Sequence, residues 1–142
     1  MPTDDAGTTL LLTIFYGFLS LVLVLLVVAA TSLYLERKRL FTLADGAALV
    51  GAEAFDLAAV RMVNDRYRPT LEAADVAASV SDYLANAPTG HFESLAVERA
   101  TTVDGRSATV ELSAYWRPPL VSLLVPDGFR IEVTAVARSV FD

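Results

Sequence analysis

The stretch LLLTIFYGFLSLVLVLLVVAATSLYL, from Leu10 to Leu35, decides the fold of this chain. It contains neither a charged residue nor a proline. As an α-helix it would be about 39 Å long, whereas the hydrocarbon core of a bilayer is roughly 30 Å thick. The sequence therefore predicts a membrane-spanning helix over residues 10–35.

The flanks of this stretch differ from those of a cleaved signal peptide. Signal peptides have a basic start, a shorter apolar stretch and a small-residue cleavage site. Here a short polar head, residues 1–9, contains Asp4 and Asp5, and Glu36-Arg37-Lys38-Arg39 follows the stretch. We therefore expect a retained single span. Because the basic residues follow the span, the positive-inside rule would place the C-terminal part of the chain in the cytoplasm.

The composition excludes several classes of function. Of 142 residues, 54% are hydrophobic and 20% are charged, and the net charge is −6. An acidic chain without a basic block binds nucleic acid poorly, because phosphate contacts need clustered Lys and Arg. There is no Cys, and the single His, His91, has no second ligand-type residue at metal spacing. We expect no catalytic residues, no metal, no cofactor, no nucleic acid and no small-molecule substrate.

Residues 36–142 are expected to form one small α+β domain, in which residues 36–62 continue the first helix. From Leu40 to Met62, apolar and small residues recur at helical spacing and no proline interrupts them. Five of them would let another backbone approach closely, and we call them the packing seam: Ala44, Ala47, Ala48, Gly51 and Ala52. The seam faces either the protein's own domain or a partner helix, and the sequence leaves both open.

A second helix is predicted from about Thr70 to Asn86, after Pro69 has broken the first. Its apolar stripe, spaced at helical intervals, consists of Val76, Val80, Tyr83 and Ala87. Turn residues from Asn86 to Gly90 then indicate a loop.

Beyond Glu93 the hydrophobic period changes from 3.6 to 2, which predicts strands. Asp104-Gly105 favours a two-residue hairpin of type I′. That turn would pair Thr101 with Ala108.

The same register would place Glu98 opposite Glu111, and such a like-charge pair is mildly destabilising. We expect Arg130 or Arg138, on the next strand, to relieve the repulsion. The alternative is a carboxylate pair that serves acid catalysis or a metal.

A third strand, predicted from Phe129 to Phe141, completes a three-stranded antiparallel sheet in the order α-α-β-β-β. The loop before it, residues 117–128, has prolines at both ends, which exclude a central strand. Its leucines indicate one apolar helical turn that covers the open edge of the core or contacts a partner or membrane surface: Leu120, Leu123 and Leu124.

Three features of the chain occur in a recognisable order. The polar head ends in Gly7-Thr8-Thr9 and opens directly onto the apolar stretch. Leu33-Tyr34-Leu35-Glu36-Arg37-Lys38-Arg39-Leu40 leads into Ala44-Asp45-Gly46-Ala47-Ala48-Leu49-Val50-Gly51-Ala52. A turn, Tyr115-Trp116-Arg117-Pro118-Pro119-Leu120, and Leu123-Leu124-Val125-Pro126 precede Thr134-Ala135-Val136-Ala137-Arg138. With this ordered set the chain resembles the TadE/TadG-like family of tight-adherence (Flp-type) pilus systems over nearly its whole length.

The resemblance implies a minor pilin-like or pseudopilin-like component of a type IV-related pilus. Its partners would be the bacterial cell membrane and other pilin-like or pilus-assembly proteins, and its domain would lie outside the cytoplasm. It also implies cleavage by a prepilin peptidase between Gly7 and Thr8, which would put Leu12 where such prepilins have Glu.

The family topology opposes the positive-inside expectation, and we prefer the family topology. The alternative is a single-pass membrane scaffold or regulator with a cytoplasmic α+β domain.

Overall fold

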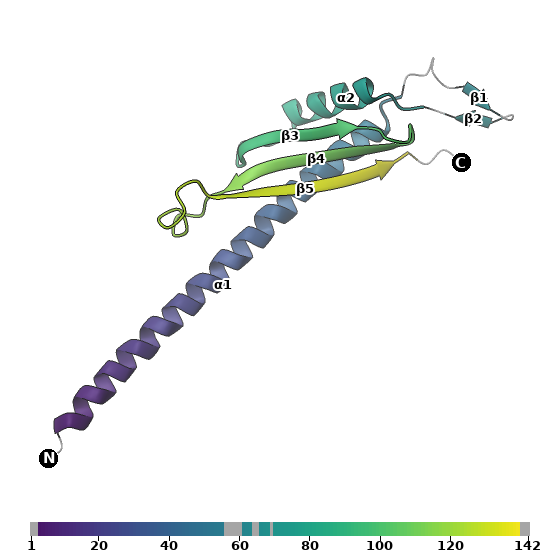
Figure 1. Ribbon diagram of the computed structural model, residues 1–142. Helices are drawn as coiled ribbons and strands as arrows, with labels where there is room; N and C mark the ends of the chain where they lie inside the picture. Colours follow the sequence, from purple (N-terminus) through teal and green to yellow (C-terminus); the bar gives the residue numbers. More distant parts are fainter. Residues whose placement is uncertain (1–2, 56–60, 64–65, 69, 140–142) are drawn as a thin grey trace. The chain divides into compact units, whose positions relative to one another are not determined.

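The structure is a computed structural model that describes residues 3–55, 61–63, 66–68 and 70–139. The elements run α1 (Thr3–Ala52), β1 (Arg61–Val63), β2 (Arg66–Arg68), α2 (Ala73–Asn86), β3 (Glu93–Thr101), β4 (Ser107–Trp116) and β5 (Phe129–Arg138) (Figure 1). The predicted α+β fold, with a long first helix, a second helix and a three-stranded antiparallel sheet, is confirmed. The antiparallel pair β1–β2 was not predicted. The chain divides into two compact units, Met1–Leu35 and Glu36–Asp142.

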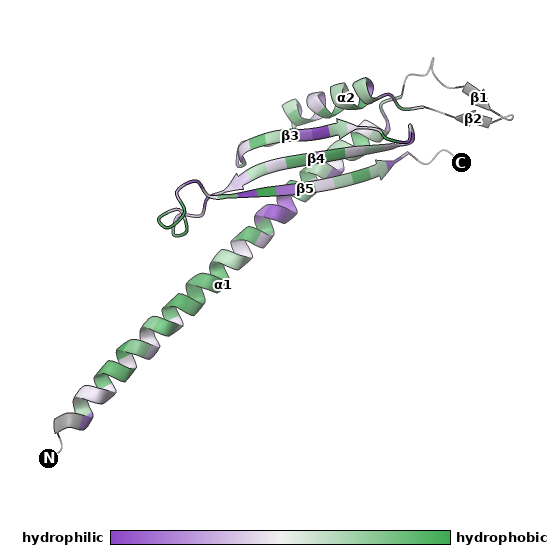
Figure 2. Cartoon of the chain, in the orientation of Figure 1, coloured by the Kyte–Doolittle hydropathy of each residue, from purple (hydrophilic) through white to green (hydrophobic). Residues whose placement is uncertain are grey.

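The first unit is the apolar part of α1, which is coloured as hydrophobic over most of its length in Figure 2. Its large apolar side chains are exposed, as in Leu11 (70%) and Phe18 (66%). The threonines that interrupt it bond to their own helix. Thr13 and Thr31 donate their hydroxyls to carbonyls four residues earlier, over 2.8 and 2.9 Å. Such bonds satisfy a hydroxyl where no water is at hand. Within the described residues, α1 is the one helix long and apolar enough to cross a membrane.

Helix α1 ends at Ala52, so the prediction that it continues to Met62 is wrong. Its last turn tightens, because the Glu53 N–H lies 3.2 Å from the carbonyls of both Leu49 and Val50. The predicted continuation falls partly on residues 56–60, outside the described ones, and partly on strand β1. The two strands contain Val63 and Tyr67, and β-branched and aromatic residues favour strands.

In the second unit, the helices pack on one face of the sheet, which has the order β3-β4-β5 (Figure 1). Strands β4 and β5 pair without interruption from Ser107↔Arg138 to Trp116↔Phe129. Alternate residues of each strand point into the core. The buried apolar strand residues are Ala108, Val110, Leu112, Ala114 and Trp116 on β4, and Ile131, Val133, Ala135 and Ala137 on β5. Ser113 of β4 is also buried, although its position alternates with theirs.

The β3–β4 hairpin differs from the predicted two-residue turn. Thr101 pairs with Thr109 rather than with Ala108. A type I′ turn needs positive φ at both central residues, whereas Gly105 has φ +69° and Ser94 is the only described non-glycine residue with positive φ.

Side-chain hydrogen bonds hold the observed turn. The Asp104 carboxylate accepts the N–H groups of Arg106 (2.9 Å) and Ser107 (2.7 Å). The Gly105 carbonyl accepts the N–H of Leu71 over 2.8 Å, which ties the turn to the segment before α2. These bonds explain why a wider loop replaces the tight turn.

Candidate functional site

The packing seam lies inside the second unit. Ala44, Ala47 and Ala48 are fully buried, and Ala52 is 1% exposed. A Cβ at Gly51 would lie 3.2 Å from both Ala108 and Val76 and 3.3 Å from Val80. The small side chains therefore let α1 approach α2 and β4 closely. The last part of α1 thus forms part of the core of the second unit.

Gly46 and Tyr83 make a contact that sequence analysis missed. A Cβ at Gly46 would overlap the Tyr83 hydroxyl and lie 3.1 Å from its Cζ atom, so glycine makes room for the ring. Tyr83 was predicted on the apolar stripe of α2, but the pattern of one helix does not reveal which glycine of another accommodates it. The Val76 and Val80 side chains of that stripe are buried, as predicted.

The predicted pair of Glu98 and Glu111 does not form, because β3 contains a bulge. Val97 pairs with Leu112 and Arg99 with Glu111, which leaves Glu98 as an extra residue between the two pairs. The bulge brings Arg99 opposite Glu111, with Nη1 3.7 Å from Oε1. The register predicted from the sequence was therefore wrong at this point.

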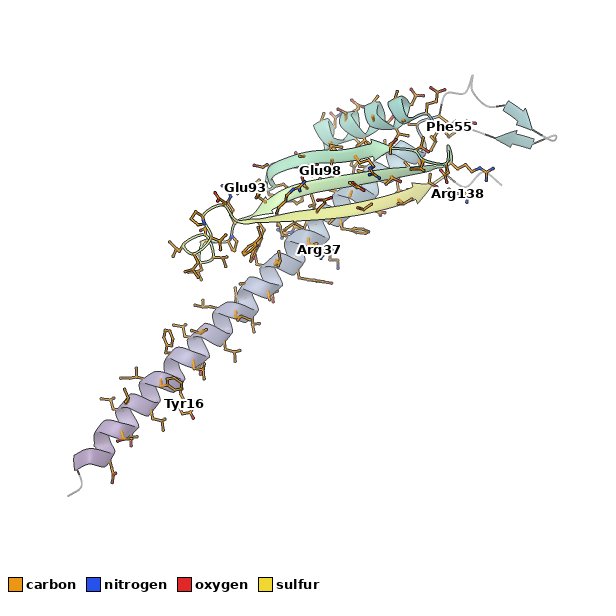
Figure 3. All side chains as sticks on the ribbon, in the orientation of Figure 1. Tyr16, Arg37, Phe55, Glu93, Glu98 and Arg138 are labelled. Atoms are coloured by element: carbon orange, nitrogen blue, oxygen red, sulfur yellow. The ribbon has the colours of Figure 1, made fainter. Side chains whose placement is uncertain are left out.

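The Glu98 carboxylate instead reaches across β4 (Figure 3). It accepts hydrogen bonds from the Ser113 hydroxyl over 2.6 Å and from Arg130 Nη2 over 2.7 Å. Arg130 thus supplies the compensating charge, as predicted. The hydrogen bonds from Ser113 and Arg130 lower the pKa of Glu98, so it is ionised at neutral pH.

The Glu98–Glu111 carboxylate pair, which was the alternative for acid catalysis or a metal, is not formed on this face, because the two carboxylates bond to different arginines. A general acid needs a carboxyl that holds its proton near working pH, whereas Glu98 is held ionised. Among the described residues, no group of three or more His, Cys, Asp or Glu side chains is placed to hold a metal ion. His91 lies beside Phe92, with 4.3 Å between ring centroids.

Residues 117–128 form a loop of consecutive turns between β4 and β5. Its leucines are exposed: Leu120 by 56%, Leu123 by 80% and Leu124 by 85%. These leucines therefore do not cover the open edge of the core, which was one of the two roles expected from the sequence. The other role, contact with a partner or a membrane surface, stays a prediction.

The suggested cleavage residues, Gly7 and Thr8, both lie inside α1 and are exposed. A Cβ at Gly7 would meet nothing within 4 Å.

The N-terminal part of the chain thus combines an exposed apolar helix, a basic cluster at Arg37-Lys38-Arg39 and a small-residue stripe that supports a folded domain. Residues 7–61 match the family model of the putative Flp pilus-assembly TadE/G-like proteins. The resemblance found in the sequence is confirmed over this TadE/G-like segment. The match supports a role related to Flp pilus assembly, with a membrane and other pilus components as partners.

The TadE/G-like segment covers the apolar stretch and the packing seam, and it ends at Arg61, where β1 begins. A comparison with curated proteins found no match, and neither did a comparison with solved structures.

Proposed function

We propose that this chain is a minor pilin-like or pseudopilin-like structural component of an Flp-type pilus system, which acts through helix packing and protein–protein contacts rather than catalysis. The observation that carries the proposal is the position of the TadE/G-like segment. It contains both the apolar stretch, residues 10–35, and the seam on which the second unit is built.

In this proposal, each part of the chain has a mechanical role. Residues 10–35 hold the chain in the membrane, and the short polar head, residues 1–9, stays at the far surface. Residues 36–142 form a domain outside the cytoplasm. Because the seam buries α1 against α2 and β4, a pull on the domain is transmitted directly to the helix. The exposed surfaces are then free to contact other pilus proteins.

The alternative is a membrane scaffold or regulator whose domain is cytoplasmic. It is favoured by the basic cluster, Arg37-Lys38-Arg39, which follows the span, whereas Asp4 and Asp5 precede it.

Topology separates the two functions. We would fuse alkaline phosphatase, which is active only after export, and in parallel a fluorescent protein that folds in the cytoplasm, to the C-terminus of the full chain. The proposal expects phosphatase activity and no fluorescence. The reverse pattern would establish the cytoplasmic alternative. Replacing Arg37-Lys38-Arg39 with Gln provides the control, since an exported domain should stay exported without these charges.

The pilus role has its own test. Deletion of the gene should reduce the pilin recovered after shearing, and the full chain should restore it. Mass spectrometry of the N-terminus in the membrane and sheared fractions would also decide whether the chain starts at Thr8. Unchanged pilin after deletion would contradict the proposed function.

A further inference from the structure

The loop of residues 117–128 lies at the same end of the second unit as Glu36, the first residue of that unit. Gly51 of α1 contacts Ala108, near the start of β4. From Gly51 back to Glu36, α1 covers about 22 Å, and β4 covers about 26 Å from Ala108 to Trp116. The last part of α1 passes behind the strands (Figure 1). With Gly51 held near Ala108 and the two lengths similar, Glu36 and the end of β4 lie at the same end of the unit. We call it the tether end, because Glu36 is joined to Leu35.

The leucines of this loop form the concentrated apolar surface at the tether end. Leu120, Leu123 and Leu124 are all more than half exposed within five consecutive positions. Single exposed apolar residues are ordinary on a protein surface, and Val103 at the opposite end of the sheet is one of them. Three together on one loop indicate a contact surface.

Part of the loop backbone is already hydrogen-bonded within the loop. The N–H groups of Ser122, Val125 and Gly128 bond to carbonyls of Pro118, Val121 and Val125, over 2.8–3.1 Å. The prolines of the loop carry no N–H at all. Entry into a medium poor in water is costly mainly for unpaired backbone groups, so this loop can bring its leucines there at reduced cost.

Basic residues lie at the tether end, where some of them pair with acidic residues. Arg37 and Lys38 are exposed next to the tether, and Arg117 stands at the base of the loop. Arg117 also pairs with Glu93 at 3.3 Å and donates its Nε–H to the Asp127 carbonyl, which fixes the base of the loop. Basic residues beside an apolar surface suit a membrane with anionic headgroups.

We propose that the leucines of this loop insert into the headgroup region of the same membrane that holds residues 10–35, as a second membrane contact. The inference rests on the proposed membrane insertion of the helix. We assign the lipid surface as the partner of these leucines, because the tether keeps this end of the domain close to the bilayer. A second contact would restrict the rotation of the domain about its tether.

The test uses the full chain reconstituted in vesicles with anionic lipid. The chain has no cysteine, so a single cysteine can carry a polarity-sensitive fluorophore at Leu123→Cys, Leu124→Cys, Leu23→Cys or Val103→Cys. We expect both loop probes to emit at shorter wavelength than the Val103 probe and to be quenched by spin labels near the headgroups. A second substitution, Leu120→Glu, should return the loop probes to a water-like emission.

The outcomes are distinct. If the Leu23 probe is quenched by spin labels deep in the lipid but the loop probes resemble the Val103 probe, the loop inference is wrong and the proposed anchor stands. If the Leu23 probe is not quenched, membrane insertion itself fails. Loop probes that are shielded from water but not quenched by lipid would mean a protein occupant, which also overturns the inference.

Discussion

Gly51 is the residue of α1 that α2 and β4 both approach, since a Cβ there would lie within 3.3 Å of Val76, Val80 and Ala108. Residue size at this point therefore sets the distance between two helices and a strand. Ala48 is in the same position one turn earlier and is fully buried.

We expect Ala48→Leu and Gly51→Leu each to lower the free energy of unfolding by about 1–3 kcal/mol, because added methylenes overpack a filled core. Urea unfolding of the full chain in micelles can be followed by fluorescence, because Trp116 is the only tryptophan and is 8% exposed. Ala78→Leu, on an exposed position of α2, is the matched control. Equal stability of the control and the two seam variants would contradict this role of the seam.

Asp104 is a second residue whose role can be measured. Hydrogen bonds from the Arg106 and Ser107 backbone N–H groups lower its pKa from 3.8 to about 2. Because the pKa is depressed in the folded state, the resulting stability is present above about pH 4 and is lost as the pH falls toward 2.

Asp104→Asn should therefore destabilise the second unit above pH 4 and converge with the wild type near pH 2 in the same urea assay. Ser107→Ala removes a hydroxyl that donates to the Asp104 carboxylate over 3.0 Å. This variant should reduce the pH dependence of the unfolding free energy only in part, because the backbone donors remain. A wild type and an Asp104→Asn variant with parallel pH profiles would rule out this carboxylate as a source of the pH dependence.

At the scale of elements, the bulge in β3 allows a side-chain contact between the two outer strands of the sheet. It turns Glu98 of β3 toward Arg130 of β5, across the central strand. The pair is solvent-accessible, so its contribution is modest and depends on salt.

A double-mutant cycle with Glu98→Gln and Arg130→Gln should show favourable coupling at low salt that shrinks toward zero in molar salt. Arg99→Gln with Arg130→Gln is a control cycle, since Arg99 is paired with Glu111 instead. If Glu98→Gln abolished pilus formation in cells without changing stability, a binding or chemical role for this face would replace the structural one.

Periodicity predicted the elements because burial dictates it: α2 buries Val76 and Val80, and β4 and β5 bury alternate residues. The bulge at Glu98 was not predictable, because an inserted residue leaves the alternating pattern legible on both sides of it. The Gly46–Tyr83 contact could not be predicted for a different reason, because it depends on how two helices cross. The strand at Arg61 was missed because its short apolar spacing also fits a helix.

At the scale of the molecule, the buried apolar residues in the described part of the chain lie between Leu40 and Ala137, within the second unit. This unit therefore contains its own core and needs no contribution from the apolar stretch.

We expect a fragment of residues 36–142 to be soluble and to unfold in one cooperative transition, with the same urea midpoint as the full chain in micelles. Trp116 fluorescence reports both, and a fragment with Leu120, Leu123 and Leu124 changed to Ser serves as a control for aggregation through the exposed loop. A fragment with exposed Trp116 fluorescence in buffer would show that the domain depends on its membrane helix.

The burial of the seam has a consequence for how such sequences diverge. A mutation at Ala48 or Gly51 can be accepted only together with a compensating change at Val76, Val80 or Ala108, so these positions should drift in concert. The part of the TadE/G-like segment that contains the seam would then reflect the fold that such chains share. Sequence changes that adapt the chain to a particular pilus would instead be found at exposed positions, where one residue can change without a compensating change.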